Sequence, residues 1–345
     1  MRARVDRIEA LIHQDTGRGF PPVFAATRGG LWGAVSALAA APGPVGILTG
    51  FFVPRGTPPA AETDGPAGGA LLALAFSRVG IPCRLLTDTA CRSACEAALA
   101  GAGLDSRRGS DDAGAGDARW DDARRDDARV GDARVGDARA GDARAGDAEL
   151  PMVLVDAVPP DASPDQVTAA WRAHGMAWMI AIERCGPGAD GKPRNMRGED
   201  VGAHAAPLEN VFTAGPWRTI AIGDGGNEVG MGSLPPGLIA ATVPFGDTIA
   251  CVTPATHLIA AGVSHWGAYA LIAGLAVVKP AWREALLACL DPAIERRILE
   301  TLVAQGPAVD GVTLDRALTI DGLGLDTHGA KREQLKDIAV WSGAT

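Results

Sequence analysis

Short apolar runs rich in β-branched residues recur along the chain and alternate with segments of helical spacing. The runs that we interpret as strands are 45–53, 82–87, 152–155, 178–182, 219–222 and 248–252. Helical segments between them include 66–79, with a proline in its first turn, and 164–174. Strands that alternate with helices are typical of parallel sheets with crossover connections. The pattern predicts an α/β fold with a doubly wound, mainly parallel (Rossmann-like) sheet and helices on both faces.

A low-complexity segment interrupts this pattern. Residues 116–150 consist of five-residue units that begin with GDARW and end with GDAEL. A period of five matches neither a helix nor a strand, and acidic and basic residues nearly cancel, so no apolar face forms. We expect 103–149 to be a flexible surface insertion, with the pentapeptide-repeat part at 108–149, inside a single domain that spans 1–345.

The stretch 258–278 is nearly uncharged and about as long as a membrane span. Ser264, His265, Trp266 and three glycines interrupt it, so we interpret it as a buried helix. Residues 1–15 mix arginines with acids and lack the apolar centre of a secretory signal. We therefore expect neither export nor a membrane partner.

Composition narrows the possible partners further. The chain has 345 residues and is 47% hydrophobic, which is enough for a full core. A net charge of −9, with no basic patch, argues against nucleic acid. Six cysteines without a CxxC pair fit reduced thiols, so we expect a cytoplasmic protein. The oligomeric state is left open by the sequence, and a homo-oligomer is compatible with it.

The densest cluster of potential active-site residues is 222–232, which follows a predicted strand. It combines five glycines with Asp224, Asn227 and Glu228. A dinucleotide-binding fingerprint needs a third glycine where Glu228 stands, and a phosphate loop needs a lysine followed by serine or threonine. We therefore expect no nucleotide cofactor, and a bound cation fits this loop better than an anion.

Acidic residues follow the ends of successive predicted strands. They are Glu62 and Asp64, then Asp88, Asp156, Glu183 and Asp224. Because parallel strands end at one edge of a sheet, we expect these carboxylates to gather there. A divalent cation (Mg²⁺ or Mn²⁺), a basic substrate group or protonation would relieve their repulsion. The candidate metal ligands are Glu62, Asp64, Glu183 and Asp224. For Asp64 and Asp88, helix capping is the alternative.

Two further segments suggest how a zwitterion would be held. Thr63 or Asp64 is expected to cap the helix that Pro66 begins, so that the helix amides face a carboxylate. Arg197 offers a planar fork for a second carboxylate, with a surface ion pair as the alternative. The residues that we expect to contact a substrate are Glu62, Thr63, Asp64, Gly65, Asn195, Arg197, Gly225, Gly226 and Asn227.

Taken together, these segments resemble the D-glutamate cyclase family. The matching stretches are LIHQDTGRGF (11–20), TGFFVPRGTPPAAETDGPAG (49–68), AIERCG (181–186), NMRGED (195–200), TIAIGDGGNEVGMG (219–232), IACVTPATHLIAAGVSHWGAYAL (249–271) and AVDGVTLDRALTIDGLGLDTH (308–328). The resemblance covers nearly all of the chain outside the repeat. The chain departs from the family pattern at Pro193, Arg194, Thr256 and His265. We interpret His265 as a core residue, with an added acid–base group as the alternative.

The resemblance implies a lyase that converts D-glutamate to 5-oxo-D-proline with loss of water, and an acidic amino acid as the small-molecule partner. Such a reaction needs a base for the ammonium, an electrophile on the reacting carboxylate and an acid for the departing oxygen. The implied catalytic residues are Glu183, Asp224 and Glu228. Glu183 or Asp224 would be the base, and Asp224 and Glu228 would alternatively hold a cation that polarises the carboxyl group.

Two other classes of function also fit the acidic cluster. One is a metal-dependent hydrolase of a phosphorylated or amide metabolite. The other is an amino-acid sensor in which the same pocket binds without turnover.

Overall fold

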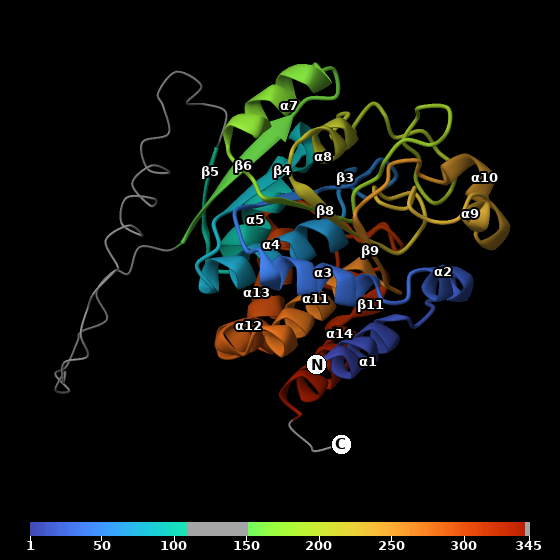
Figure 1. Cartoon of the computed structure of the whole chain (residues 1–345). Coiled ribbons are helices and arrows are strands. Elements are labelled where there is room, and N and C mark those ends of the chain that lie inside the picture. Colours follow the sequence, from blue (N-terminus) through green and yellow to red (C-terminus); the bar gives the residue numbers. More distant parts are fainter. Residues whose placement is uncertain (109–150, 342–345) are drawn as a thin grey trace.

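A sheet of parallel strands forms the centre of the molecule in the computed structural model, which describes residues 1–108 and 151–341 (Figure 1). In spatial order the strands are β5 (Asp105–Arg108), β6 (Met152–Val158), β4 (Cys83–Asp88), β1 (Val45–Thr49), β7 (Trp178–Ile182), β8 (Arg218–Gly223) and β9 (His257–Ala260). Every neighbouring pair in this sheet is parallel. The predicted doubly wound, mainly parallel α/β sheet is confirmed.

Helices cover both faces of the sheet. Side chains alternate between the two faces along each strand and so enter two different hydrophobic clusters. Ile47 and Leu85 belong to one cluster, whereas their neighbours Leu48 and Leu86 belong to the other. The helices of the first cluster are α1 (Arg2–Ile12), α3 (Gly30–Ala40), α4 (Asp64–Arg78), α5 (Arg92–Gly101), α11 (Ser264–Val278), α12 (Arg283–Cys289), α13 (Pro292–Gln305) and α14 (Leu325–Val340). Those of the second are α2 (Pro21–Ala26), α7 (Pro164–Ala173), α8 (Glu209–Ala214), α9 (Leu238–Thr242) and α10 (Gly246–Ile249). All six cysteines are free and buried, as expected for reduced thiols.

The direction of winding reverses between β1 and β7, which are neighbours in the centre of the sheet. The hydroxyl of Thr49 at the end of β1 donates to the carbonyl of Ile182 at the end of β7, at 2.8 Å. In open α/β sheets such a reversal leaves a crevice beyond the carboxyl ends of the strands, where ligands bind. The topology therefore places a binding site after Thr49 and Ile182.

Two small hairpins lie over this edge. They are β2 (Phe52–Val53) with β3 (Ala60–Ala61), and β10 (Thr319–Ile320) with β11 (Leu323–Gly324). Backbone bonds join the first hairpin to the C-terminal segment, from Val309 to Ala61 and from Thr63 to Val309, both at 2.9 Å. The short helical turns are η1 (Thr89–Cys91) and η2 (Pro280–Trp282).

Three of the predicted elements are wrong in detail. Residues 248–252 are not a strand, since they finish α10 and continue as a loop. The strand on that edge is β9, which we had assigned to the helix 258–278; the helix itself begins only at Ser264. The predicted strand 45–53 is divided at Gly50, whose φ of 110° suits glycine. In each case a continuous apolar run concealed a turn.

The insertion begins later than 103. Residues Asp105–Arg108 form β5, which pairs with β6 at the edge of the sheet. This strand is polar, so no apolar alternation marked it in the sequence. The remainder of the pentapeptide-repeat segment lies outside the described residues.

Two of the strand-end carboxylates form internal ion pairs with arginines. Asp156 lies inside β6 and pairs with Arg84 of β4, with one contact at 3.0 Å. Asp88 pairs with the fully buried Arg184, which also donates to the carbonyl of Gly50 at 3.0 Å. Asp88 is not a side-chain cap of η1. These two carboxylates therefore hold the sheet edge together and do not reach the crevice.

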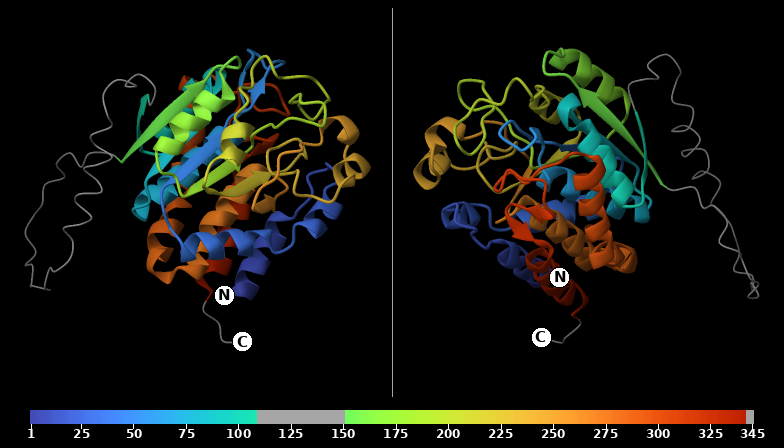
Figure 2. Two further views of the ribbon diagram at one scale, coloured as in Figure 1. Left: turned by 45° about the horizontal axis from the view of Figure 1, so that its top comes forward. Right: turned by 180° about the vertical axis from the view of Figure 1, so that it is seen from behind.

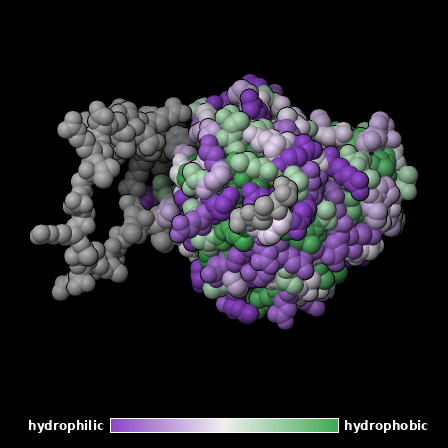
Figure 3. All heavy atoms as spheres, turned by 60° about the horizontal axis from the view of Figure 1, so that its bottom comes forward, coloured by the Kyte–Doolittle hydropathy of each residue, from purple (hydrophilic) through white to green (hydrophobic). Residues whose placement is uncertain are grey.

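No helix in the described ranges is long and apolar enough to cross a membrane. The apolar helix α11 has 15 residues and packs against α1, α3, α4, α12 and α14. The N- and C-terminal ends of the described chain lie together, where Arg4 donates to the carbonyl of Trp341 at 2.8 Å (Figure 2). On that side of the molecule hydrophobic residues form separate patches among hydrophilic ones (Figure 3).

The buried Arg184–Asp88 pair predicts a large loss of stability when one partner is removed. Replacing Asp88 with alanine leaves the guanidinium buried without its counterion, which costs about 3–5 kcal/mol. Urea denaturation followed by circular dichroism measures the free energy of unfolding. The matched control is Asp6→Ala, which breaks the exposed Arg2–Asp6 pair and is expected to cost less than about 1 kcal/mol. Equal losses in the two variants would contradict the prediction.

Candidate active site

A cavity of about 270 Å³ opens beyond the carboxyl ends of β1, β7 and β8. Its walls come from the N-terminal loop, the first hairpin, the loops after β7 and β8, and the C-terminal segment. The lining residues are Gly17, Arg18, Phe51, Val53, Pro54, Arg55, Glu62, Glu183, Asn195, Met196, Arg197, Asp224, Asn227, Pro244, Gly311, Val312 and Asp321. The cavity thus lies at the predicted edge of the sheet.

Three buried carboxylates meet beside this cavity, and two of them, Glu183 and Asp224, line it. Asp64 is the first residue of α4, Glu183 follows β7 and Asp224 follows β8. Each offers an oxygen, and these oxygens all lie within 4.8 Å of one another. All three residues are buried. The expectation that strand-end acids converge therefore holds for Glu183 and Asp224, and the start of α4 brings in Asp64.

The backbone around Glu183 is shaped to bring its side chain to the cavity. Its φ of 44° lies in the left-handed region, which costs a non-glycine residue about 1–3 kcal/mol. Gly65 allows α4 to begin close by, because a Cβ there would lie 2.6 Å from the hydroxyl oxygen of Thr49 and 3.2 Å from Cβ of Glu183. The next residue, Arg184, is anchored by its buried ion pair with Asp88.

The three carboxylates differ in their partners. Both oxygens of Asp64 and Oε2 of Glu183 have no hydrogen-bond partner among the described residues. Asp224 Oδ2 accepts the amide of Ser264 at 2.8 Å and lies 3.0 Å from the guanidinium of Arg18. Asp224 is thus the member of the trio whose charge is directly compensated.

Burial raises the pKa of all three carboxyl groups, and repulsion from neighbouring acids of the site adds to the effect. For Asp64 the amide of His265 opposes this rise without reaching hydrogen-bond geometry. Burial, with repulsion from Asp321 and Asp310, also raises the pKa of Glu62 to about 8. An empty cavity therefore favours protonated carboxyls, and a bound cation would favour ionised ones.

Glu228 holds the glycine-rich loop from within. Its Oε1 accepts the amides of Asp224 at 3.1 Å and Gly225 at 2.6 Å, and its Oε2 accepts the amide of Gly226 at 2.7 Å. Gly226 has a φ of 98°, which explains why glycine stands there. Because both oxygens are engaged, the geometry favours a positioning role for Glu228 over an acid–base role. The loop amides are also not free to bind a phosphate.

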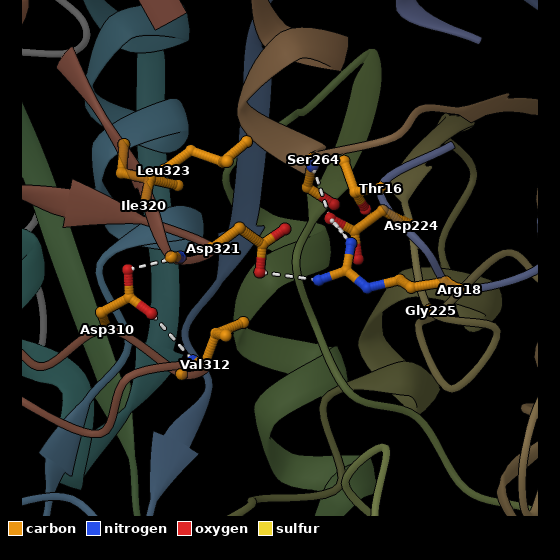
Figure 4. A network of polar contacts seen from close by, with 12 residues as sticks. Thr16, Arg18, Asp224, Gly225, Ser264, Asp310, Val312, Ile320, Asp321 and Leu323 are labelled. Atoms are coloured by element: carbon orange, nitrogen blue, oxygen red, sulfur yellow. Dashed lines mark hydrogen bonds and ion pairs between the residues drawn. The ribbon is translucent and has the colours of Figure 1, made fainter. Parts of the chain in front are cut away.

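Arg18 and Asp321 belong to the site although we assigned them no role from the sequence (Figure 4). Arg18 Nη2 lies 2.7 Å from Asp321 Oδ1, while Nη1 reaches Asp224. Asp310 shapes the segment that presents Asp321, since it accepts the amides of Val312 at 2.8 Å and Gly322 at 2.7 Å. Arg18 and Asp321 both lie in stretches that resemble the family, and this resemblance was the one indication of them in the sequence.

The predicted substrate-binding residues are only partly brought together. Glu62, Asn195, Arg197 and Asn227 line the cavity, whereas Thr63, Asp64, Gly65, Gly225 and Gly226 are absent from its lining. Neither Thr63 nor Asp64 caps α4, so that expectation is wrong. The Thr63 hydroxyl instead donates to the carbonyl of Thr319 at 2.9 Å, which ties α4 to β10.

Asn195, Asn227 and Arg197 shape the wall of the cavity. Asn195 Oδ1 accepts the amides of Arg197 at 2.9 Å and Glu199 at 3.0 Å, so its side chain forms a local turn. Asn227 donates to the carbonyl of Arg194 at 2.8 Å and leaves Oδ1 without a partner among the described residues. Arg197 is exposed and makes one long contact of 3.5 Å with the carbonyl of Gly311. Its guanidinium is therefore available at the cavity mouth.

His265 lies in the core and not on the cavity lining, in agreement with our interpretation. Its Nε2 is 3.2 Å from Glu295 Oε1, and Tyr269 and Arg332 bind the same carboxylate. This network joins α11, α13 and α14 behind the site.

A comparison with protein families matches residues 8–336 to the family described as "D-glutamate cyclase-like, C-terminal". The chain belongs to this family. Among curated proteins it is similar to "D-glutamate cyclase, mitochondrial" of Homo sapiens, with 30% identity over 186 residues. The matched stretch makes up 46% of this chain and 29% of the human protein. The family and the name of this relative support a cyclase or lyase.

The raised pKa of Glu62 predicts a pH-dependent loss of stability. The folded state holds this proton up to about pH 8, whereas an unfolded glutamate releases it near pH 4.5, so stability falls as pH rises between these values. Glu62→Gln removes this loss and is expected to raise Tm at pH 8.5 relative to wild type, by roughly 2–4 °C for each 1 kcal/mol of stability regained, with little difference at pH 5. Scanning calorimetry of the ligand-free protein measures both. Glu284→Gln, on the surface of α12, serves as the control, and a pH-independent effect of Glu62→Gln would contradict the prediction.

Proposed function

We propose that this protein is a hydro-lyase that cyclises D-glutamate to 5-oxo-D-proline with release of water. The observation that supports this most is the buried trio of Asp64, Glu183 and Asp224, two of which line a cavity of amino-acid size beside Arg18, in a chain of the D-glutamate cyclase-like family. Carboxylates that share a site with one guanidinium offer both proton acceptors and proton donors.

The reaction replaces a carbon–oxygen bond with a carbon–nitrogen bond, and it otherwise requires only proton transfers. The ammonium nitrogen of glutamate gives up two protons and attacks the side-chain carboxyl carbon. A carbon–nitrogen bond forms, a carbon–oxygen bond breaks, and the departing oxygen takes up the two protons and leaves as water. No oxidant or reductant is needed, and holding the two ends of one molecule together supplies much of the rate.

The charges of the cavity suit the two ends of this substrate. The ammonium group faces the acidic floor, where it relieves the repulsion between Glu183, Asp224 and Glu62. Arg197, at the mouth of the cavity, is suited to the carboxylate that does not react. Glu183 or Asp224 then acts as the base, and the protonated partner supplies the departing oxygen with its proton.

Replacing Glu183 with glutamine removes a group that accepts and returns protons, so turnover is expected to fall by roughly 10²–10⁴. Chiral chromatography of 5-oxoproline formed from D- and from L-glutamate measures the rate and the stereochemical preference. Glu300→Gln, on the exposed side of α13, is the matched control.

The result separates three readings of the site. Full activity of Glu183→Gln would remove this residue from the acid–base chemistry. Tight binding of glutamate to a folded wild-type protein, without product, would favour the sensor. Activity on phosphorylated metabolites alone would favour the hydrolase.

A divalent cation is the second part of the proposal. Asp64, Glu183 and Asp224 place three carboxylate oxygens within 4.8 Å, and the oxygens of Asp64 have no other partner among the described residues. Carboxylate oxygens are the ligands that Mg²⁺ and Mn²⁺ prefer. The residues therefore fit such an ion, which would polarise the reacting carboxyl group when bound. Glu62, the fourth expected ligand, lies outside this close group.

Mn²⁺ is expected to raise the Tm of the wild-type protein, because an ion that binds only the folded state stabilises it. Asp64→Asn removes the carboxylate that lacks other partners and is expected to abolish most of this shift. Electron paramagnetic resonance counts the bound Mn²⁺ independently of activity. Asp337→Asn, exposed on α14, should retain the shift; an unchanged Mn²⁺ stoichiometry in Asp64→Asn would contradict the assignment.

A further inference from the structure

The loop that carries Arg18 is built to hold its side chain in one place. The carboxylate of Asp15 accepts the amides of Arg18 at 3.0 Å, Gly19 at 3.3 Å and Phe20 at 3.3 Å. The hydroxyl of Thr16 donates to the carbonyl of Gly262 at 3.0 Å, which fastens the loop to the segment before α11. The side chain is only 18% exposed and lines the cavity.

Three groups hold the guanidinium of Arg18. Nη1 donates to the carbonyl of Gly262 at 3.0 Å and faces Asp224, while Nη2 donates to Asp321 (Figure 4). A guanidinium has five N–H groups, so Nε and the second hydrogen of Nη2 have no partner in these contacts. Within residues 1–108 and 151–341, Arg18 is also the one arginine that forms ion pairs with the cavity carboxylates Asp224 and Asp321.

The proposed reaction needs a cation at this position. Attack of an amine on a carboxylate concentrates negative charge on the carboxyl oxygens, and the surrounding acids would repel that charge. A preorganised cation beside those oxygens stabilises the developing charge without rearrangement during the reaction. A planar guanidinium can also bind a carboxylate through two parallel N–H groups.

We propose that Arg18 is a catalytic residue that binds the reacting side-chain carboxylate of the substrate and stabilises the oxyanion formed on it. This role rests on the proposed cyclase function and names the electrophilic group of that site. Asp321 is then a positioning residue, because it binds Nη2 and thereby fixes the orientation of the guanidinium beside the cavity.

The test compares Arg18→Gln, Arg18→Lys and Arg18→Ala with wild type. The expected result for Arg18→Gln is a fall in kcat of roughly 10²–10³, the range found when one oxyanion donor is removed, with a smaller change in KM. Arg18→Lys should recover part of the rate, since it keeps the charge but not the fork. Added guanidinium ion should raise the rate of Arg18→Ala, which a purely structural role would not allow. Arg28→Gln, an exposed arginine of the same N-terminal segment, is the control for the removal of a charge.

Each outcome decides the proposal. A kcat of Arg18→Gln close to wild type overturns it, as does a loss confined to KM. If Arg18→Gln does not fold, as shown by circular dichroism, the lysine variant and the guanidinium rescue of the alanine variant decide, and no rescue in folded protein overturns the role. A wild-type protein that forms no 5-oxoproline overturns the cyclase function first, whereas an active wild type with an active Arg18→Gln overturns only the role of Arg18.

Discussion

Repulsion between buried carboxylates is the constraint on which the rest of this structure depends. Asp64, Glu183 and Asp224 lie within reach of one ion, and Glu62 and Asp321 line the same cavity. Burial of so many acids is unfavourable unless donors, cations or protons compensate them. The packing around the sheet edge can be understood as the means of that compensation, which is left incomplete where a substrate or an ion would bind.

Two helices supply part of the compensation for the buried carboxylates. Both α4 and α11 have 15 residues and begin at the site, so the positive ends of their dipoles face the carboxylates. The first amide of α11 donates to Asp224, whereas Asp64 stands at the start of α4 without a hydrogen-bond partner among the described residues. The network of His265 and Glu295 behind α11 fixes the direction in which that helix points. His265, one of the residues that depart from the family pattern, thus supports the scaffold and not the cavity.

The other part of this compensation comes from residues near the two ends of the chain. The N-terminal loop contributes Arg18 and the C-terminal segment contributes Asp321, two residues 303 positions apart in the sequence. Their ion pair closes one side of the cavity, and the Arg184–Asp88 pair joins the loop after β7 to the end of β4 at the same carboxyl edge of the sheet.

The sequence alone determined the sheet and the location of the site, because both follow from local rules. Apolar runs that alternate with helical segments predict parallel strands, and such strands end at one edge, so Glu183 and Asp224 had to meet there. Only the tertiary structure decided which acids remain free. Asp88 and Asp156 resemble site residues in the sequence, yet Arg184 and Arg84 neutralise them, and Glu228 is taken up by the amides of its own loop. The sequence did not reveal Arg18 as a site residue for the same reason. The periodicity of apolar residues indicates the secondary structure of a segment. The pairing of charges depends instead on which loops the completed fold brings together.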